Sequence, residues 1–281
     1  MPTASTPTRP LLDHLILLAS SLPLATAHFS GLGFAVHPGG THADGLTENA
    51  LVSLPDGVYL ELIAFLPGAA RSAHWWGAKT PNGWADWALT PPAGMSAADV
   101  LAAMHSSASA RGGREQWNAP RAGGRRTPEG RQLEWEVAFP NSEICGMRGR
   151  LPFICADKTP REWRVPSSPP GARTNSAEGF AKLVLLARPG GLAAYAEGLT
   201  AMLDAISPNG PDDPSRRLFR VATPSGGAVE VEVKEPECAE EEVFVTERGE
   251  GLYKVSVRRS LEGNRMDTLP ADSTMGRITF V

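Results

Sequence analysis

The chain has 281 residues, of which 42% are hydrophobic and 21% charged, and its formal net charge is -4. These values are typical of a soluble globular protein with one large domain or two of ordinary size. A charge this close to neutral argues against nucleic acid as a partner, because nucleic-acid binding leaves a strongly basic footprint. No run of about 18 apolar residues occurs, so no membrane span is predicted.

The three cysteines, Cys145, Cys155 and Cys238, are far apart and form no CxxC pair. This spacing argues against both a zinc-thiolate site and a disulfide framework. A reducing compartment is the natural setting for such a chain, and we expect a cytoplasmic protein. Residues 1–10 are polar and rich in proline, without the apolar core of a secretory signal, and are predicted to be a disordered leader.

The first predicted unit, residues 11–66, places two polar side chains inside apolar strands. The pattern predicts a strand, a helix and three strands, at residues 11–19, 20–31, 33–37, 49–54 and 58–65. His14 lies in the first strand and Glu61 in the last, and Pro38-Gly39-Gly40 is predicted to be a turn. A polar group in a buried strand is costly unless it is paired, hydrogen-bonded or bound to a metal. The two residues therefore indicate a site.

Residues 67–171 are predicted to be an insertion with connecting strands. The segment begins with a tryptophan cluster that includes Trp75, and a helix at 96–110 follows, with Ser96 as its cap and Asp99 at the capping-box position. An arginine-rich stretch, 111–131, is predicted to be a solvated surface loop. The remaining predictions are strands at 132–139 and 151–156, and a linker at 166–171.

Residues 172–281 are predicted to form a second unit of the same kind. A strand, a helix and two strands are expected at 180–187, 191–206, 218–222 and 228–233, then a glutamate-rich loop at 235–242 and strands at 243–246 and 253–257. The segment KLVLLA, which starts at Lys182, nearly repeats HLILLA, which starts at His14. With the matching element order, this repeat predicts a duplicated βαβββ module.

Several segments of the chain resemble the glyoxalase-like branch of the vicinal-oxygen-chelate superfamily. They are LDHLILL (12–18), PGGTH (38–42), DGVYLELIAF (56–65), GGRRTPEGRQLEWEVAFP (123–140), LPFICADKTPREWRVP (151–166) and GEGLYKVSV (249–257). The resemblance implies an α+β fold in which two βαβββ modules form a curved-sheet cleft. It also implies a metal-dependent lyase, isomerase or dioxygenase acting on a small oxygenated molecule. The alternative is a metal-free protein of the same fold that binds or sequesters a small molecule.

The resemblance places His14 and Glu61 at metal-ligand positions. Imidazole and carboxylate together suit a divalent ion of zinc, iron, manganese, nickel or cobalt. His42 is either an exposed loop residue or a group that reaches over the cleft, as a third ligand or as a general base. Tyr59 shares a strand face with Glu61 and so faces the cleft.

Two further candidates for substrate contact are Asn49 and Trp75. Asn49 either satisfies backbone groups at a strand end or contacts substrate. Trp75 belongs to a cluster that either packs over the first sheet or gives the cleft an aromatic wall.

Lys182 stands where metal-binding relatives often have a histidine. It could act in the cleft as an anion anchor or an amine base, extend to solvent, or pair with Glu61 or with a glutamate of the second unit. A structural ion pair is expected between Asp157 and the arginines at 161 and 164. The strand edges of the modules leave room for a homodimer.

Overall fold

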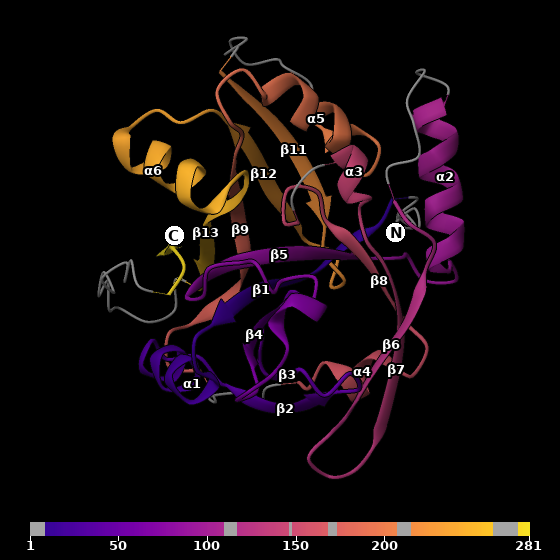
Figure 1. The fold of residues 1–281 in the computed structure, drawn as a ribbon, viewed down its shortest axis with the longest axis vertical. Coiled ribbons are helices and arrows are strands. Elements are labelled where there is room, and N and C mark those ends of the chain that lie inside the picture. The colour runs from indigo at the N-terminus through magenta and orange to yellow at the C-terminus, as the bar shows by residue number, and fades with distance from the viewer. Residues whose placement is uncertain (1–8, 110–116, 146–147, 168–172, 207–214, 261–274) are drawn as a thin grey trace.

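The computed structural model describes residues 9–109, 117–145, 148–167, 173–206, 215–260 and 275–281, which form a closed β-barrel and a separate sheet (Figure 1). Around the barrel the strand order is β1-β4-β3-β2-β6-β7-β8-β5. These strands are β1 (Leu11–Ala19), β2 (His37–His42), β3 (Thr47–Ser53), β4 (Tyr59–Phe65), β5 (Gly83–Thr90), β6 (Arg121–Arg126), β7 (Gln132–Ala138) and β8 (Phe153–Asp157). Within the described residues no helix is long and apolar enough to cross a membrane.

The first module of the barrel is β1-α1-β2-β3-β4, in the predicted element order. Helix α1 (Leu22–Gly31) begins where Ser21 accepts a hydrogen bond from the backbone N–H of Leu24. Strand β2 differs from the prediction, because the Pro-Gly-Gly segment lies inside it rather than in a turn. Gly39 and Gly40 make this possible. A Cβ at Gly39 would overlap the side chain of Asn49, and Gly40 has a φ of +129°.

The second half of the barrel is another βαβββ module, made of β5, α2 (Ala97–Ser109), β6, β7 and β8. Residues 67–171, predicted to be an insertion, therefore contain the module that pairs with the first one to enclose the cleft. The module was missed because its third element, RAGGRR, has the composition of a loop. Helix α2 begins as predicted, with reciprocal hydrogen bonds between Ser96 and Asp99.

Residues 173–281 supply a third unit, which forms a sheet of its own outside the barrel with strand order β10-β11-β12-β9-β13-β14. Its elements are β9 (Ala177–Leu186), α5 (Leu192–Thr200), β10 (Asp204–Ala205), β11 (Arg216–Ala222), β12 (Ala228–Lys234), α6 (Ala239–Arg248), β13 (Gly251–Arg259) and β14 (Ile278–Phe280). From β9 to β12 this is again the βαβββ order. The predicted α+β class with βαβββ modules around a cleft is confirmed, but this unit does not enclose the cleft.

Helix α6 replaces the glutamate-rich loop and short strand that the sequence predicted. Three glutamates in its first turn stabilise the positive end of the helix dipole. Phe244 and Val245 pack against Val184, Leu186 and Tyr253 of the sheet. Because the segment is rich in charged residues, its sequence did not indicate the amphipathic helix that it forms. Residues 1–8 of the predicted leader and 168–171 of the predicted linker lie outside the described residues. Arg9, at the end of the predicted leader, is ordered and donates to the backbone carbonyls of Thr200 and Leu203.

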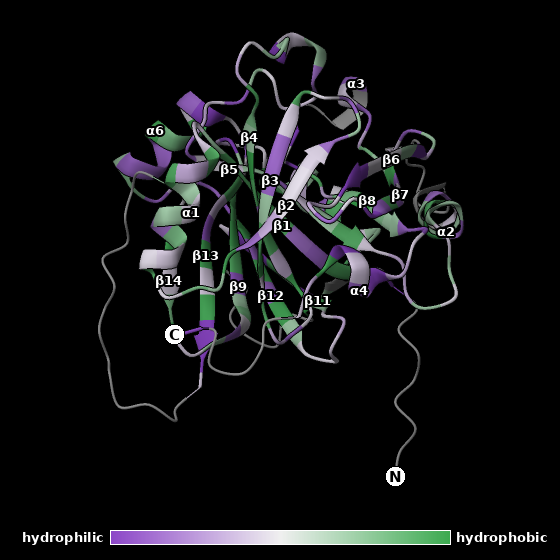
Figure 2. Ribbon diagram, turned by 90° about the horizontal axis from the view of Figure 1, so that it is seen from below, coloured by the Kyte–Doolittle hydropathy of each residue, from purple (hydrophilic) through white to green (hydrophobic). Residues whose placement is uncertain are grey.

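The core has two layers that follow the alternation of side chains along each strand. In β1, Leu15 and Leu17 point out of the barrel and join the large core shared with the second sheet and the helices. Ile16 and Leu18 point inward and belong to a smaller core inside the barrel. Figure 2 shows hydrophobic residues along the central strands and both hydrophobic and hydrophilic residues on the outer helix α6.

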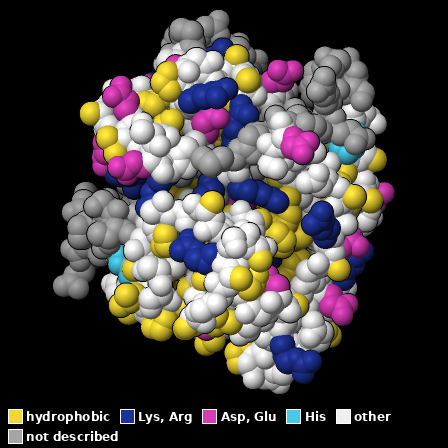
Figure 3. Space-filling view, viewed as in Figure 1, with side chains coloured by type: hydrophobic (Ala, Val, Ile, Leu, Met, Phe, Trp, Pro, Cys, Tyr) yellow, Lys and Arg dark blue, Asp and Glu magenta, His cyan; other side chains and the backbone are white. Residues whose placement is uncertain are grey.

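The surface carries no single basic stripe on the face that Figure 3 draws. Lys and Arg side chains are scattered among apolar and acidic groups there.

Candidate functional site

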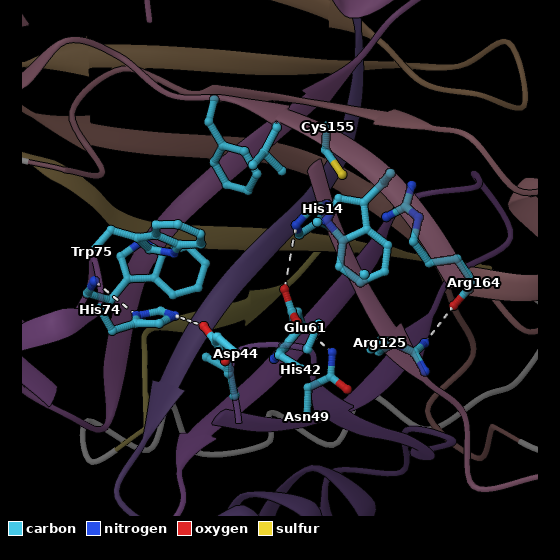
Figure 4. A pocket seen from close by; sticks show the side chains of 18 of the residues that line it. His14, His42, Asp44, Asn49, Glu61, His74, Trp75, Arg125, Cys155 and Arg164 are labelled. Carbon is cyan, nitrogen blue, oxygen red and sulfur yellow. Dashed lines mark hydrogen bonds and ion pairs between the residues drawn. The ribbon is translucent and has the colours of Figure 1, made fainter. Parts of the chain in front are cut away.

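A cavity opens inside the barrel, with walls from both modules. It encloses about 830 Å³, counting its open mouth. Its walls come from β1, β2, β3, β4, β6, β7 and β8, and from the segment before β5 that contains Trp75. Figure 4 shows the polar side chains that converge at its centre. A closed eight-stranded barrel is just wide enough for side chains or one small ligand, which suits this cavity.

His14 enters the cavity from β1 with its ring held on three sides. Its Nδ1 lies 2.7 Å from an oxygen of Asp13, and its ring stacks on Tyr59 at a centroid distance of 4.6 Å. Phe153 contacts the ring edge. The register between β1 and β5 shifts at Asp13. This bulge lets two successive residues, Asp13 and His14, both take part in the site. The remaining nitrogen, Nε2, is left facing Glu61, 3.6 Å from Oε2.

Glu61 is the centre of the cluster and receives groups from three strands. His42 Nε2 lies 3.4 Å from Oε1, and the amide of Asn49 donates to the same oxygen at 2.5 Å. Burial raises the pKa of Glu61, but the hydrogen bond and charge of His42, with His14 and Asn49, outweigh burial and lower it to about 2. Glu61 is therefore a carboxylate throughout the physiological range.

His42 is oriented in the same manner as His14. Its Nδ1 lies 2.8 Å from the hydroxyl of Thr47, which leaves Nε2 directed at Glu61. Both histidines thus have their outer nitrogen held by a neighbour and their inner nitrogen turned to one carboxylate. This is how metal-ligating histidines are usually supported.

Beneath the cavity floor, two arginines and two aspartates form an ion network whose centre, Asp13 and Arg164, is buried. Asp13 accepts from Arg161 and from Arg164, whose Nη1 and Nη2 are both 3.1 Å from Oδ2. Asp157 accepts from Arg164 at 2.8 Å. The predicted pairing of Asp157 with both arginines is confirmed. Arg164 also donates to the Tyr59 hydroxyl, so this network fixes the two residues that hold His14.

Arg125, on β6, lines the cavity beside this network. The sequence placed it in a surface loop, yet only 3% of it is exposed. Its guanidinium donates to the backbone carbonyls of Gly39 and Arg164. The segment RAGGRR gives no local signal for this, because Arg125 and its exposed neighbour Arg126 are the same residue type and only the pairing of β6 in the barrel distinguishes them.

The mouth of the cavity is aromatic. His74, for which the sequence pattern gives no signal, accepts a hydrogen bond from the Trp76 N–H, and burial lowers its pKa to about 4. Trp75 is 41% exposed and packs on Phe139, with ring centroids 4.6 Å apart. Asp44 lies at the rim, 3.9 Å from His74 Nε2.

Most of the predicted site residues line this one cavity: His14, His42, Asn49, Tyr59, Glu61 and Trp75. Lys182 does not. It lies on β9 outside the barrel, where its ammonium is 2.9 Å from Glu230 and 2.8 Å from Glu232. Of the alternatives weighed for Lys182, the structure shows the pairing with glutamates of its own unit.

The third unit keeps the strand geometry of the site but not its residues. On β1 and β4, the paired positions are His14 with Tyr59 and Ile16 with Glu61. On β9 and β12, they are Lys182 with Glu230 and Val184 with Glu232. Lys182 therefore takes the place of His14, and Glu232 the place of Glu61.

A family profile described as a glyoxalase-like domain matches residues 12–203. The chain belongs to the glyoxalase-like domain family. The predicted resemblance is thereby confirmed, and the match covers both modules of the barrel. No curated protein matches this chain at significant similarity.

Two solved structures show the same fold as this glyoxalase-like chain. A hypothetical protein from Staphylococcus aureus has a TM-score of 0.64 and 11% identity, over 96% of this chain and 99% of that one. A mutant of 4-hydroxymandelate synthase from Streptomyces coelicolor has a TM-score of 0.53 and 15% identity, over 89% of this chain and 71% of that one. At these identities the likeness establishes the fold alone.

The donor set at the centre of the cavity has the chemistry of a divalent-metal site. Two imidazoles and one carboxylate are common ligands of zinc, iron and related ions. Two ligands of one tetrahedral zinc stand roughly 3.4 Å apart, close to the 3.4 and 3.6 Å found between Glu61 and the two histidines. The histidines approach different oxygens, and within the described ranges no three His, Cys, Asp or Glu side chains already stand in ligating geometry. Binding would require the three donors to turn toward one common point.

Proposed function

We propose that this glyoxalase-like protein is a metal-dependent enzyme, of the lyase, isomerase or dioxygenase class, that acts on a small oxygenated molecule inside the barrel. One observation carries the proposal. His14 and His42 each have Nδ1 held by a neighbour and Nε2 turned to Glu61. Because Nδ1–H of His14 is donated to Asp13, a neutral His14 turns the lone pair of Nε2 toward the buried Glu61 carboxylate, which is unfavourable unless a cation lies between them.

In this proposal His14, His42 and Glu61 hold the ion. Asp13 and Thr47 fix the two rings, and fixed outer contacts of this kind usually matter for metal affinity. A divalent ion would supply Lewis acidity to an oxygen of the substrate.

The remaining side chains position and shield the substrate. Asn49 holds the Glu61 carboxylate in place. The aromatic rings at the mouth, including Trp75, exclude water from the centre of the cavity.

Metal content of the purified, untagged protein tests the proposal. We expect near-stoichiometric metal in the wild type, measured by mass spectrometry, and its loss in His14→Ala, His42→Ala and Glu61→Ala. His28→Ala is the matched control, because His28 lies on α1, away from the cavity. The control should keep its metal. A well-folded wild type that takes up no metal after supplementation would contradict the proposal.

A metal-free binding protein is the second candidate. It is favoured by the contacts within the site, since each histidine already meets a separate oxygen of Glu61 and Asn49 completes the carboxylate. A protonated histidine would then supply the positive charge. Under this candidate, the wild type and the three alanine variants would all lack metal, while the wild type would still bind a small molecule in the barrel.

A further inference from the structure

Arg125 is a buried cation without an ion-pair partner among the described residues. Within the part of the chain that the structure describes, its guanidinium donates to two backbone carbonyls, those of Gly39 and Arg164. The carboxylates of Glu61 and Glu129 act on it through space, without direct contact. A buried charge normally needs a counter-charge, because transfer from water is costly and neutral carbonyls offset only part of the loss.

The neighbouring carboxylates are already engaged. Asp13 and Asp157 are balanced by Arg161 and Arg164. Glu61 is taken by the two histidines and Asn49. The one cavity-lining guanidinium without a carboxylate partner among the described residues is therefore that of Arg125, and a ligand in the cavity can supply the missing negative charge.

The other side of the cavity is apolar and aromatic. In the view of Figure 4, Trp75 and Arg125 lie on opposite sides of Glu61. Trp75, Phe139 and Phe153 form a continuous set of contacting rings, with centroids 4.6 and 4.8 Å apart. Planar apolar groups bind well against such walls.

We propose that the cavity takes a small carboxylic acid with an aromatic or other planar apolar body. Its carboxylate pairs with Arg125, and its apolar body lies against Trp75 and Phe139. The planar guanidinium can donate two parallel N–H bonds to the two oxygens of a carboxylate. A neutral amide in the ligand has only one such oxygen and no negative charge, so it cannot replace the carboxylate. This inference names the substrate class of the proposed function and rests on the same cavity.

Binding of three probes tests the inference: phenylacetate, the isosteric neutral phenylacetamide, and acetate, which has the charge without the ring. Affinities are measured by isothermal titration calorimetry at constant ionic strength on the full chain. We expect wild-type protein to bind phenylacetate at least about tenfold more tightly than either of the other probes. Equal affinity for acid and amide overturns the carboxylate site, and equal affinity for acetate and phenylacetate overturns the apolar wall.

Two variants assign the effect to the residue. Arg125→Gln should bring phenylacetate and phenylacetamide to within about twofold of each other. Arg126→Gln, an exposed change on the next residue of the same strand, should keep the wild-type preference. A preference that survives in folded Arg125→Gln overturns the assignment. Because the wild-type comparison needs no variant, the inference remains testable even when Arg125→Gln does not fold.

The result is separable from the metal proposal. The same titrations are run before and after treatment with a chelator. A preference for the acid in chelator-treated protein supports the Arg125 site whatever the metal analysis finds. Metal-loaded protein that shows no such preference overturns the Arg125 site and leaves the metal proposal intact.

Discussion

Replacing Asp13 with asparagine is expected to lower the free energy of unfolding by about 3 kcal/mol at neutral pH. Asp13 is fully buried and accepts hydrogen bonds from Arg161, Arg164 and His14 at the same time. Removing one partner of a buried ion pair typically costs about 3–5 kcal/mol, because the other charge stays buried. The lower end applies here, because Asp157 still accepts from both arginines.

Equilibrium urea denaturation followed by tryptophan fluorescence measures this loss. Asp157→Asn is the matched control, because Asp157 is partly exposed and does not contact His14. We expect it to cost less than half as much as Asp13→Asn. A loss below about 1 kcal/mol for Asp13→Asn, or equal losses for the two variants, would refute the argument from burial.

The pH dependence of the same variant gives a second check. Burial raises the pKa of Asp13, but Arg161, Arg164 and the hydrogen bond from His14 outweigh it and hold the pKa well below its usual value of 3.8. A carboxyl whose pKa is lower in the folded state stabilises the fold above its unfolded pKa and loses that effect as pH falls. The stability gap between wild type and Asp13→Asn should thus be full near neutral pH and narrow below about pH 4.

Three further variants probe single contacts. Gly39→Ala places a Cβ 1.9 Å from Oδ1 of Asn49, so it should lower the free energy of unfolding in urea by about 1–3 kcal/mol. It should also weaken metal uptake more than the control Gly31→Ala does, because nothing lies within 4 Å of a Cβ at Gly31. Ser96→Ala removes the cap of α2 and should cost about 1 kcal/mol in the same assay; no measurable loss would contradict the capping role. Trp75→Ala should change stability by less than about 1 kcal/mol, since the residue is 41% exposed, but should abolish the tighter binding of phenylacetate over acetate.

The centre of the site could be predicted because it breaks the pattern of its own strands. His14 and Glu61 are polar residues in apolar runs, and the structure brings them together with His42. Period-two alternation was also enough to place Tyr59 on the cavity side of β4. These inferences needed only local sequence and the cost of burying a polar group.

The second module could not be recognised in the same way, because its strands carry weak signals. Strand β6 reads RAGGRR, and its inward residue Arg125 looks like part of a solvated loop until tertiary pairing buries it. The repeat between His14 and Lys182 pointed instead to the third unit, which has the stronger apolar strand but does not enclose the cavity. Pairing between distant strands is decided by the whole fold, and a local pattern does not contain it.

The ion pair between Lys182 and Glu232 has a consequence for what each unit requires from its surroundings. In the third unit the positive charge is the ammonium of Lys182, which is part of the chain and cannot dissociate from it. The first module, in our proposal, must obtain its charge from the pool of free ions in the cell. The same pair of strand positions thus occurs twice in one molecule. One copy holds a cation that is part of the chain, and the other, under the metal proposal, would hold a cation bound from solution.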